Sequence, residues 1–564
     1  MSRVELRVFG RSACRGGVAE IVLASSSAIA ADGTASPEPG SAKRSSQLVV
    51  FWCATAALYL TLIWLYGRSV TFPALSLGDE TRLSEVGALP FFDALLHAGS
   101  SPLRPGDNAW FWLLAHSDRL VAGRAALLGM FLLTTAFVQY YASERGESWI
   151  AGVCSAWCFA LNPTTASVVC WLSGAHVALC ALGVLTYVEC SQRLLNRSPT
   201  EPTRALDWAG ALGGLSFALA FYELAVLAPL LVVLDWALLK PRAAASTLQR
   251  LLVASGLCVA AFVALQLASG ARADGWFGDS PALRAASAPR YYLENFMLWM
   301  WPWGRLGVGI PDAPSAPAIA NTLCAALVLT TWTMLWKLRR WDPVSAFGFA
   351  WFILFLIPAF ALPEPIAPYH LYLPMLGFVF AGARVTLWVL ERASTSIRRP
   401  RLRLGFDVLV SVFFLWTFAP LVDETMRTLE AWGDEEQLYL LTLQNYPNHI
   451  QALARLSLWL AAKPPAVKTP AQSSWEQFVD ESLMRPLREP PAALIAQGRQ
   501  LAEQRRDAES GSAFARALAA GARGDERLAA GSGLARALSR LNQPASAAAW
   551  SARLQSEYPT PTLP

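Results

Sequence analysis

The chain has 564 residues, of which 54% are hydrophobic and only 15% are charged. Because soluble proteins carry about 25% charged residues, this composition predicts an integral membrane protein and excludes an ordinary soluble enzyme. The net charge of +5 is small and gives no reason to expect nucleic acid as a partner. The nine cysteines show neither metal-binding spacing nor a disulfide framework.

Residues 1–46 contain four early arginines, a run of small residues and a final Lys43-Arg44. The run resembles the end of a signal peptide, but Glu20 at its start argues against one. We expect a disordered cytoplasmic tail. The apolar segment 48–65 that follows is close to the length needed to cross about 30 Å of hydrocarbon. Because the basic tail is expected on the cytoplasmic side, the chain should leave the first span on the outer side of the membrane.

Residues 67–120 form the first outer loop in this topology. The loop holds two adjacent carboxylates, Asp79 and Glu80, and an expected amphipathic helix from Ser84 to His97. Carboxylates beside the bilayer can serve as a general base or as metal ligands. A solvated acidic pair without a role is the alternative. Asp107, in the same loop, is expected to contribute little.

Ten more apolar segments bring the expected number of transmembrane helices to about eleven. Alternation places four Lys- and Arg-rich loops inside, whereas the outer loops are poor in these residues apart from the long loop 270–317. We therefore expect a transmembrane domain over 47–422. Its further spans are near 121–141, 149–162, 172–190, 206–221, 224–239, 251–269, 318–336, 344–362, 371–390 and 407–422.

Beyond Asp423 the apolar spans stop, and an odd number of spans places the remaining chain outside. Residues 423–564 are rich in Ala, Arg and Glu with helical periodicity, which predicts a soluble helical domain. The segments 430–444 and 450–462 predict a helical hairpin. Tetratricopeptide-like repeats that bind a protein partner are one interpretation of this domain, and a spacer of packed helices is the other.

The stretch that begins at Leu161 resembles a motif of membrane glycosyltransferases with C-terminal tetratricopeptide repeats. The family frame is Leu-His-Pro-x-His-x-Glu-x-Val-x-Trp-x-x-Gly-Arg, and five positions match without a gap: Leu161, Pro163, Val169, Trp171 and Gly174. Later, Tyr222-Glu223 is similar to the family's Ser-Lys-Glu stretch, and Leu371-Tyr372-Leu373-Pro374 is similar to its Tyr-Leu-Pro element. The resemblance covers about residues 50–460.

This resemblance implies a GT-C fold enzyme of the protein O-mannosyltransferase kind, which transfers a sugar from a polyprenyl-phosphate carrier to a protein or glycan acceptor outside. Asp79 would be the general base that takes a proton from the acceptor hydroxyl, and Glu80 would support it. Whether the pair holds a divalent metal stays open. The leaving phosphate needs a cation, for which Arg104, Arg290 and His370 are candidates. Glu223 and Tyr372 are further candidates for substrate binding.

Several ionisable residues of the family frame are replaced in this chain. The replacements are Asn162, Thr165, Ser167, Ala175, Tyr222, Pro368 and Tyr369. A GT-C scaffold that has lost catalysis, with a helical tail that binds a partner, is therefore the alternative function. Transport ranks third because no pair of broken helices stands out in the sequence.

Three residues have two interpretations each from the sequence. Glu223 lies between apolar runs, where an unpaired carboxylate costs about 2.5 to 3.5 kcal/mol at mid-membrane, so it either has a role or is hydrated at a span end. His176 either bonds a carbonyl across helices or faces a cavity. His370 either contacts phosphate or is an interfacial histidine. The aromatic residues of 291–303 predict an interfacial helix or a groove for the lipid carrier.

Overall fold

A computed structural model of the chain describes fourteen stretches, and every regular element within them is a helix. The all-α class expected from the sequence is therefore confirmed for these stretches. The N-terminal 40 residues, the loop 270–317 and most of the expected span 318–336 lie outside them. The described stretches are 41–72, 79–97, 103–117, 120–146, 148–197, 205–239, 245–269, 337–356, 368–397, 400–445, 491–505, 507–519, 524–540 and 544–557, with isolated positions between 322 and 333 and at 522.

The described residues of the membrane part of the chain form a series of helices. In chain order they are α2 (Ser41–Tyr66), η1 (Gly67–Thr71), α3 (Asp79–Gly87), α4 (Phe91–Leu95), α5 (Pro105–Ser117), α6 (Leu120–Gly146), α7 (Trp149–Ala160), α8 (Pro163–Cys170), η2 (Leu172–Gly174), α9 (Ala175–Asn196), α10 (Ala205–Phe221), η3 (Glu223–Leu227), α11 (Ala228–Leu239), α12 (Ala245–Ala268), α16 (Pro343–Leu356), η5 (Pro368–Leu371), α17 (Tyr372–Ser396) and α18 (Pro400–Trp432).

Five helical stretches are long and apolar enough to cross a membrane, which is compatible with a multi-pass membrane protein. They are Leu48–Thr71, Leu120–Gly146, Leu172–Asn196, Ala245–Ala268 and Tyr369–Ser396. Within the described residues the number rises to six at most, when α7 and α8 are counted as one bent span. The expected spans 206–221 and 344–362 correspond to the shorter apolar helices α10 and α16. The expected span 224–239 begins as the 3-10 helix η3, so only twelve of its residues are α-helical.

The break between α7 and α8 was not expected, because residues 163–170 were assigned to a loop between spans. The two helix axes differ by 65°, and every residue of α8 is buried. The side chain of Asn162 caps α8 by accepting from the backbone N–H of Thr164 at 3.0 Å. Tyr66 and Thr425 donate their hydroxyls to carbonyls at the end of α7. Since these bonds satisfy the freed backbone groups, the broken helix is stable inside the bundle.

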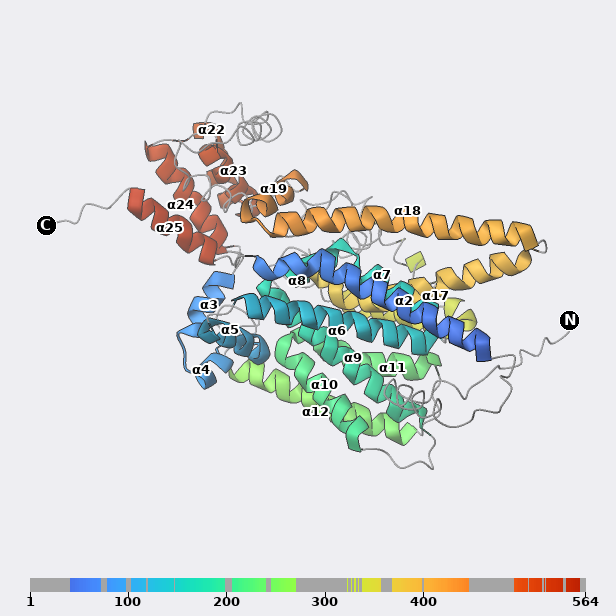
Figure 1. Ribbon diagram of the computed structural model, residues 1–564. Coiled ribbons are helices and arrows are strands. Elements are labelled where there is room, and N and C mark those ends of the chain that lie inside the picture. Colours follow the sequence, from blue (N-terminus) through green and yellow to red (C-terminus); the bar gives the residue numbers. More distant parts are fainter. Residues whose placement is uncertain are drawn as a thin grey trace.

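Two helix pairs pack closely through glycine. A Cβ on Gly183 of α9 would lie 2.7 Å from the carbonyl oxygen of Gly214 on α10, and a Cβ on Gly348 of α16 would lie 2.6 Å from that of Gly377 on α17. Small residues at such crossings let backbones approach in an apolar solvent. In Figure 1 the long helices run in roughly the same direction, while α3–α5 lie beyond one end of them.

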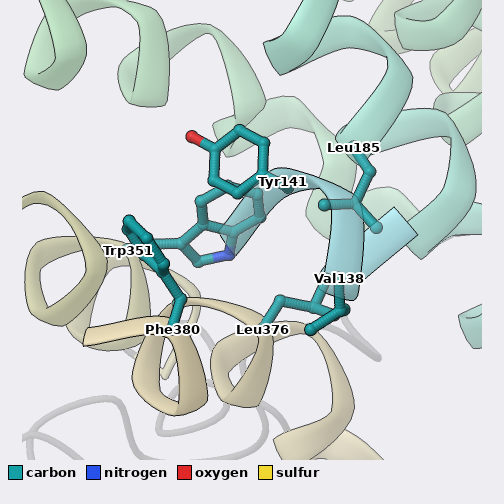
Figure 2. Close-up of a pocket in the computed structure, with 7 residues that line it drawn as sticks. Val138, Tyr141, Leu185, Trp351, Leu376 and Phe380 are labelled. Atoms are coloured by element: carbon teal, nitrogen blue, oxygen red, sulfur yellow. The ribbon is translucent and has the colours of Figure 1, made fainter. Parts of the chain in front are cut away.

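One small cavity lies in the middle of the bundle, between α6, α9, α16 and α17 (Figure 2). Its volume is about 10 Å³, and its lining is almost entirely apolar. Two lining residues carry polar side-chain atoms, and both atoms have partners: the hydroxyl of Tyr141 accepts a hydrogen bond from Gln192 at 2.8 Å, and the indole N–H of Trp351 donates to the carbonyl of Leu373 at 3.1 Å. A space of this size holds one water molecule at most, so this cavity is no substrate site.

The amphipathic helix expected from Ser84 to His97 is in fact two short helices, α3 and α4. Pro90 separates them with an extended backbone, φ −58° and ψ 150°. Proline has no N–H to donate and disfavours helical geometry at the residue before it, so the helix cannot run through this position.

The C-terminal part of the chain does not begin with a break in secondary structure. Helix α18 continues from residue 400 to Trp432, through the expected boundary at 423 and through Pro420, and α19 (Glu435–Asn445) follows. Helices α22 (Pro491–Glu503), α23 (Asp507–Ala519), α24 (Gly524–Arg540) and α25 (Pro544–Glu557) then pack on one another around a hydrophobic cluster of their own. The second half of the expected hairpin, 450–462, lies outside the described residues.

Candidate functional site

Several of the polar residues singled out in the sequence gather at one end of the helix bundle. This is the end at which η1 and α10 finish, α6, α9 and α17 begin, and the short helices α3–α5 lie (Figure 1). The carboxylate of Asp79 and the ion pair between Arg104 and Glu223 both lie here, and His176 joins them through hydrogen bonds and ring contacts.

Asp79 is not a solvated loop residue, because its side chain is fully buried at the start of α3. One carboxylate oxygen accepts from the backbone N–H and the hydroxyl of Ser173, at 3.1 and 2.6 Å. The other accepts from the N–H of Leu172 at 3.3 Å. Burial raises the pKa of Asp79 to about 6, although the bonds from Ser173 and the charge of Arg124 act in the opposite direction.

The turn that binds Asp79 depends on Gly174. A Cβ at this position would touch the backbone of Val168 on α8, where it would lie 2.8 Å from the Cα atom. No residue other than glycine fits at this position without moving the turn. This turn directs the backbone N–H groups of Leu172 and Ser173 toward the carboxylate of Asp79.

Arg124 supplies a buried positive charge next to this turn. It lies in the first turn and a half of α6, is 1% exposed, and donates to the carbonyl oxygen of Cys170 at 2.6 Å. Cys170 is the last residue of α8, and the helix dipole favours a cation at the C-terminus of a helix. Arg124 also interacts electrostatically with Asp79, so it links the end of the broken helix to the carboxylate.

Arg104 and Glu223 form a bidentate ion pair between the start of α5 and η3. The Nε and Nη2 atoms of Arg104 donate to the two carboxylate oxygens at 2.8 and 2.7 Å. The guanidinium also lies over the ring of Tyr222, 5.1 Å from its centroid. Gln266 of α12 holds the preceding residue, Leu103, by bonding its backbone N–H at 2.9 Å. Glu223 is therefore paired and not simply hydrated, which corrects that interpretation of the sequence.

Asp107 is also part of this site, although the sequence predicted no role for it. Its side chain is 3% exposed and lies 3.3 Å from Arg82, which also donates to Asn108 at 2.9 Å. The second carboxylate oxygen of Asp107 is buried and has no hydrogen-bond partner among the described residues. Burial raises the pKa of Asp107, and the charges of Arg82 and Arg104 oppose this shift. Asp107 is consequently unsuitable as a control position.

His176 links the two polar groups. Its Nδ1 atom bonds the carbonyl oxygen of Ser173, the residue that also donates to Asp79. A carbonyl partner was one of the two interpretations, but this carbonyl lies three residues earlier in the same turn and not on another helix. The imidazole ring packs edge-on against Tyr222, with ring centroids 5.0 Å apart, and Tyr222 lies under Arg104. A continuous chain of contacts therefore runs from Asp79 to Glu223.

The remaining predicted site residues have different outcomes. His370 is buried, and its ring centroid lies 4.2 Å from that of Tyr369. It lies on the same side of the bundle as Arg104, and the charge of Arg104 acts on its imidazole. Tyr372 is buried too, but its ring lies against Phe159 at 5.1 Å, away from the contacts described above. Arg290, the aromatic segment 291–303 and the side chain of Glu80 lie outside the described residues.

The site offers no ready set of metal ligands in the described part of the chain. No three His, Cys, Asp or Glu side chains come close enough together there to hold a metal ion. A metal shared by Asp79 and Glu80 stays a prediction, since the side chain of Glu80 is not among those described.

Sequence reasoning missed Arg82, Arg124 and Ser173. Arg124 carried a usable signal, because it is the one charged residue in the first twenty residues of an otherwise apolar segment, 120–146, and intramembrane charges mark functional or paired sites. Ser173 carried none, because its role depends on the turn between η2 and α9. Comparisons with known proteins do not extend this picture: no family model and no curated protein matches the chain.

Proposed function

We propose that the protein is a membrane glycosyltransferase that moves a sugar from a polyprenyl-phosphate donor to a hydroxyl of a protein or glycan acceptor, with Asp79 as the general base. The observation that carries the proposal is a carboxylate fully buried at the end of a membrane helix bundle, oriented by three hydrogen bonds and acted on by the charge of the buried Arg124. The resemblance around Leu161–Gly174 supports it, because this stretch forms the broken helix and turn that hold Asp79.

The basicity of Asp79 suits this role. A general base works best when its pKa is near the operating pH, because it is then both ionised and able to take a proton. A carboxyl with a pKa of about 6 is mostly ionised at neutral pH and is a stronger base than an exposed aspartate. The direct test is sugar transfer from a labelled lipid-linked donor by the wild type and by Asp79→Asn.

Arg104 is the cation best placed for the departing phosphate. Glu223 occupies its Nε and Nη2 atoms, whereas its Nη1 atom makes no hydrogen bond to the described residues. The side chain keeps 18% of its surface exposed. The ion pair thus fixes the guanidinium plane and leaves one N–H edge for an anion, which is how arginine holds a phosphate oxygen.

Removing the hydroxyl of Ser173 is expected to change the pH dependence of transfer. The bond from this hydroxyl lowers the pKa of Asp79, so Ser173→Ala raises it above about 6. Activity rises with pH as the base loses its proton, and the acidic limb of the rate profile should therefore move to higher pH. Rates measured from pH 5 to 8 check this.

Ser155→Ala is the matched control for that experiment, because Ser155 is a buried serine that bonds a backbone carbonyl elsewhere, that of Val379. Its profile should follow the wild type. An acidic limb that stays in place in Ser173→Ala would show that Asp79 does not set it.

The distribution of Lys and Arg predicts that the C-terminal helices lie outside, on the same side as the site. A reporter that is active only in the cytoplasm, fused after Pro564, is accordingly expected to stay inactive. The same reporter fused at the connection between α17 and α18, which is flanked by basic residues and expected inside, is the positive control. Activity of the C-terminal fusion would contradict both the topology and the odd number of spans.

A non-catalytic scaffold is the second candidate function. Asp79 and Arg104 both have structural partners, which is the observation that favours it. A groove of about 480 Å³ between α24 and α25, lined by small residues and Arg536, would then receive a protein partner. This candidate predicts a folded wild-type protein that transfers no sugar.

A further inference from the structure

Helix α8 connects the break in the bundle to the turn that binds Asp79. All eight residues of α8 are buried. Just beyond its end, Leu172 and Ser173 donate their backbone N–H groups to the carboxylate. Gly174 packs this turn against the backbone of Val168 in α8. Because α8 and the turn are packed on each other, a shift of α8 moves the donors of Asp79.

Two hydroxyls from other helices hold the opposite end of α8, where the chain breaks. The hydroxyl of Tyr66, at the end of α2, donates to the carbonyl oxygen of Ala160 at 2.8 Å and lies 3.2 Å from the hydroxyl of Thr165 in α8. The hydroxyl of Thr425, in α18, donates to the carbonyl oxygen of Leu161 at 2.9 Å. In an unbroken helix these carbonyls would accept from backbone N–H groups further along the chain, so the two hydroxyls take the place of the missing donors.

The C-terminal end of α18 is fixed next to Thr425. Arg68 of η1 donates to the carbonyl oxygen of Met426 at 3.0 Å and lies 3.4 Å from the carboxylate of Glu430. Leu429, one turn after Thr425, belongs to the main hydrophobic cluster of the bundle. This end of α18 is therefore packed into the bundle, and its hydroxyl is held against the break.

We propose that Tyr66 and Thr425 are positioning residues for Asp79 and that they act on it through α8. Without its hydroxyl donor, a buried carbonyl at the break is left unpaired, which favours movement of the helix end toward another donor. The turn then moves with α8, and the N–H groups of Leu172 and Ser173 lose their alignment with the carboxylate. The inference rests on the proposed function for the role of Asp79 as the base, and it goes beyond that function by giving α2 and α18 a part in the site.

The test measures the protection of two backbone N–H groups and needs no turnover. Thr425→Val nearly keeps the shape of the side chain and removes its hydroxyl. Purified full-length protein in lipid nanodiscs is followed by hydrogen–deuterium exchange and mass spectrometry. The amides of Leu172 and Ser173 should exchange about two- to tenfold faster in the variant, which is the worth of about one hydrogen bond. The amides of residues 184–188 in α9 should keep the wild-type rate.

Three further variants make the result specific. Thr428→Val is the matched control, because Thr428 is also buried in α18 but bonds the carbonyl oxygen of Glu424 in its own helix. Exchange at the turn should stay at the wild-type rate in this variant. Thr425→Ser restores a donor and should restore the wild-type rate as well. Tyr66→Phe removes the second hydroxyl and should speed exchange at the same two amides.

A positioning role also predicts how sugar transfer changes. Thr425→Val should lower the rate at saturating donor by about two- to tenfold, the worth of one hydrogen bond. The donor concentration for half-maximal rate should not change, because no proposed donor contact is altered. Thr425→Ser should recover the wild-type rate.

Wild-type exchange at Leu172 and Ser173 in folded Thr425→Val would overturn the role of Thr425. The same result in folded Tyr66→Phe would overturn the role of Tyr66, so loss of folding in one variant still leaves a measurement. Equally fast exchange in Thr428→Val would show a general loosening of α18 and would also overturn the inference. Exchange that changes as expected, without sugar transfer by the wild type, would remove only the proposed function. Transfer by the wild type with unchanged exchange in the variants would remove only the positioning role.

Discussion

Asp79→Asn is expected to lower sugar transfer by about 10²- to 10⁴-fold, the usual contribution of a positioned general base. Asparagine keeps an oxygen that can accept from the N–H and hydroxyl of Ser173, but it cannot take a proton from the acceptor. The loss should appear in the rate at saturating donor and not in donor affinity. Initial rates in membranes that contain equal amounts of each protein measure it.

Asp93→Asn is the control for this substitution. Asp93 lies in the neighbouring helix α4 and is exposed, so the same chemical change there should leave transfer unaltered. Asp107 would mislead, since it is buried beside Arg82. If Asp79→Asn transfers sugar at the wild-type rate, then another group takes the proton.

Arg104→Met is expected to produce the largest loss of stability, about 3 to 5 kcal/mol, because it leaves the carboxylate of Glu223 buried without its partner. The side chain of Glu223 is only 7% exposed, so solvent cannot replace the guanidinium. Denaturant-induced unfolding of the solubilised protein, followed by near-UV circular dichroism, measures the change.

The double variant Arg104→Met/Glu223→Leu separates the structural role of this ion pair from a role in binding. Removing both charges relieves the unpaired carboxylate, so most of the lost stability should return. Binding of farnesyl phosphate should stay weak in the double variant if Nη1 of Arg104 contacts the phosphate. Full recovery of both properties would show that the pair only joins α5 to η3.

The sequence predicted the helical class and most of the long spans, because about 20 consecutive apolar residues is a strong signal. It also predicted that Asp79, Arg104, Glu223 and His370 belong together. The alternation of inner and outer loops places all four residues on the outer side, and this inference needs no knowledge of how the helices pack.

The sequence could not predict what these side chains bond to. Asp79 reads as exposed because a polar loop normally faces water, yet the turn at Ser173 buries it. This turn exists only because α8 breaks away from α7 and Gly174 closes on Val168. The break is held by hydroxyls of Tyr66 and Thr425, which are distant along the chain, and the turn meets Asp79 across 93 residues.

Helix breaks inside apolar runs were the other source of error. The hydropathy of a segment is the same whether its helix crosses the membrane unbroken or bends within it. Residues 163–170 and the start of 224–239 were therefore misassigned. Asn162-Pro163 was the available signal, since asparagine followed by proline is the usual start of a new helix. The same signal would have revealed a broken helix, which the sequence interpretation considered absent.

The central claim is that this protein transfers a sugar from a lipid carrier, and one measurement tests it most directly. Membranes with wild-type protein or Asp79→Asn are supplied with polyprenyl-phosphate donors labelled in mannose, glucose or galactose, and the label is followed into protein and glycan fractions. Our account predicts that one label leaves the lipid fraction in wild-type membranes and stays there with Asp79→Asn. All three labels remaining in the lipid fraction, with folded wild-type protein present, would contradict it.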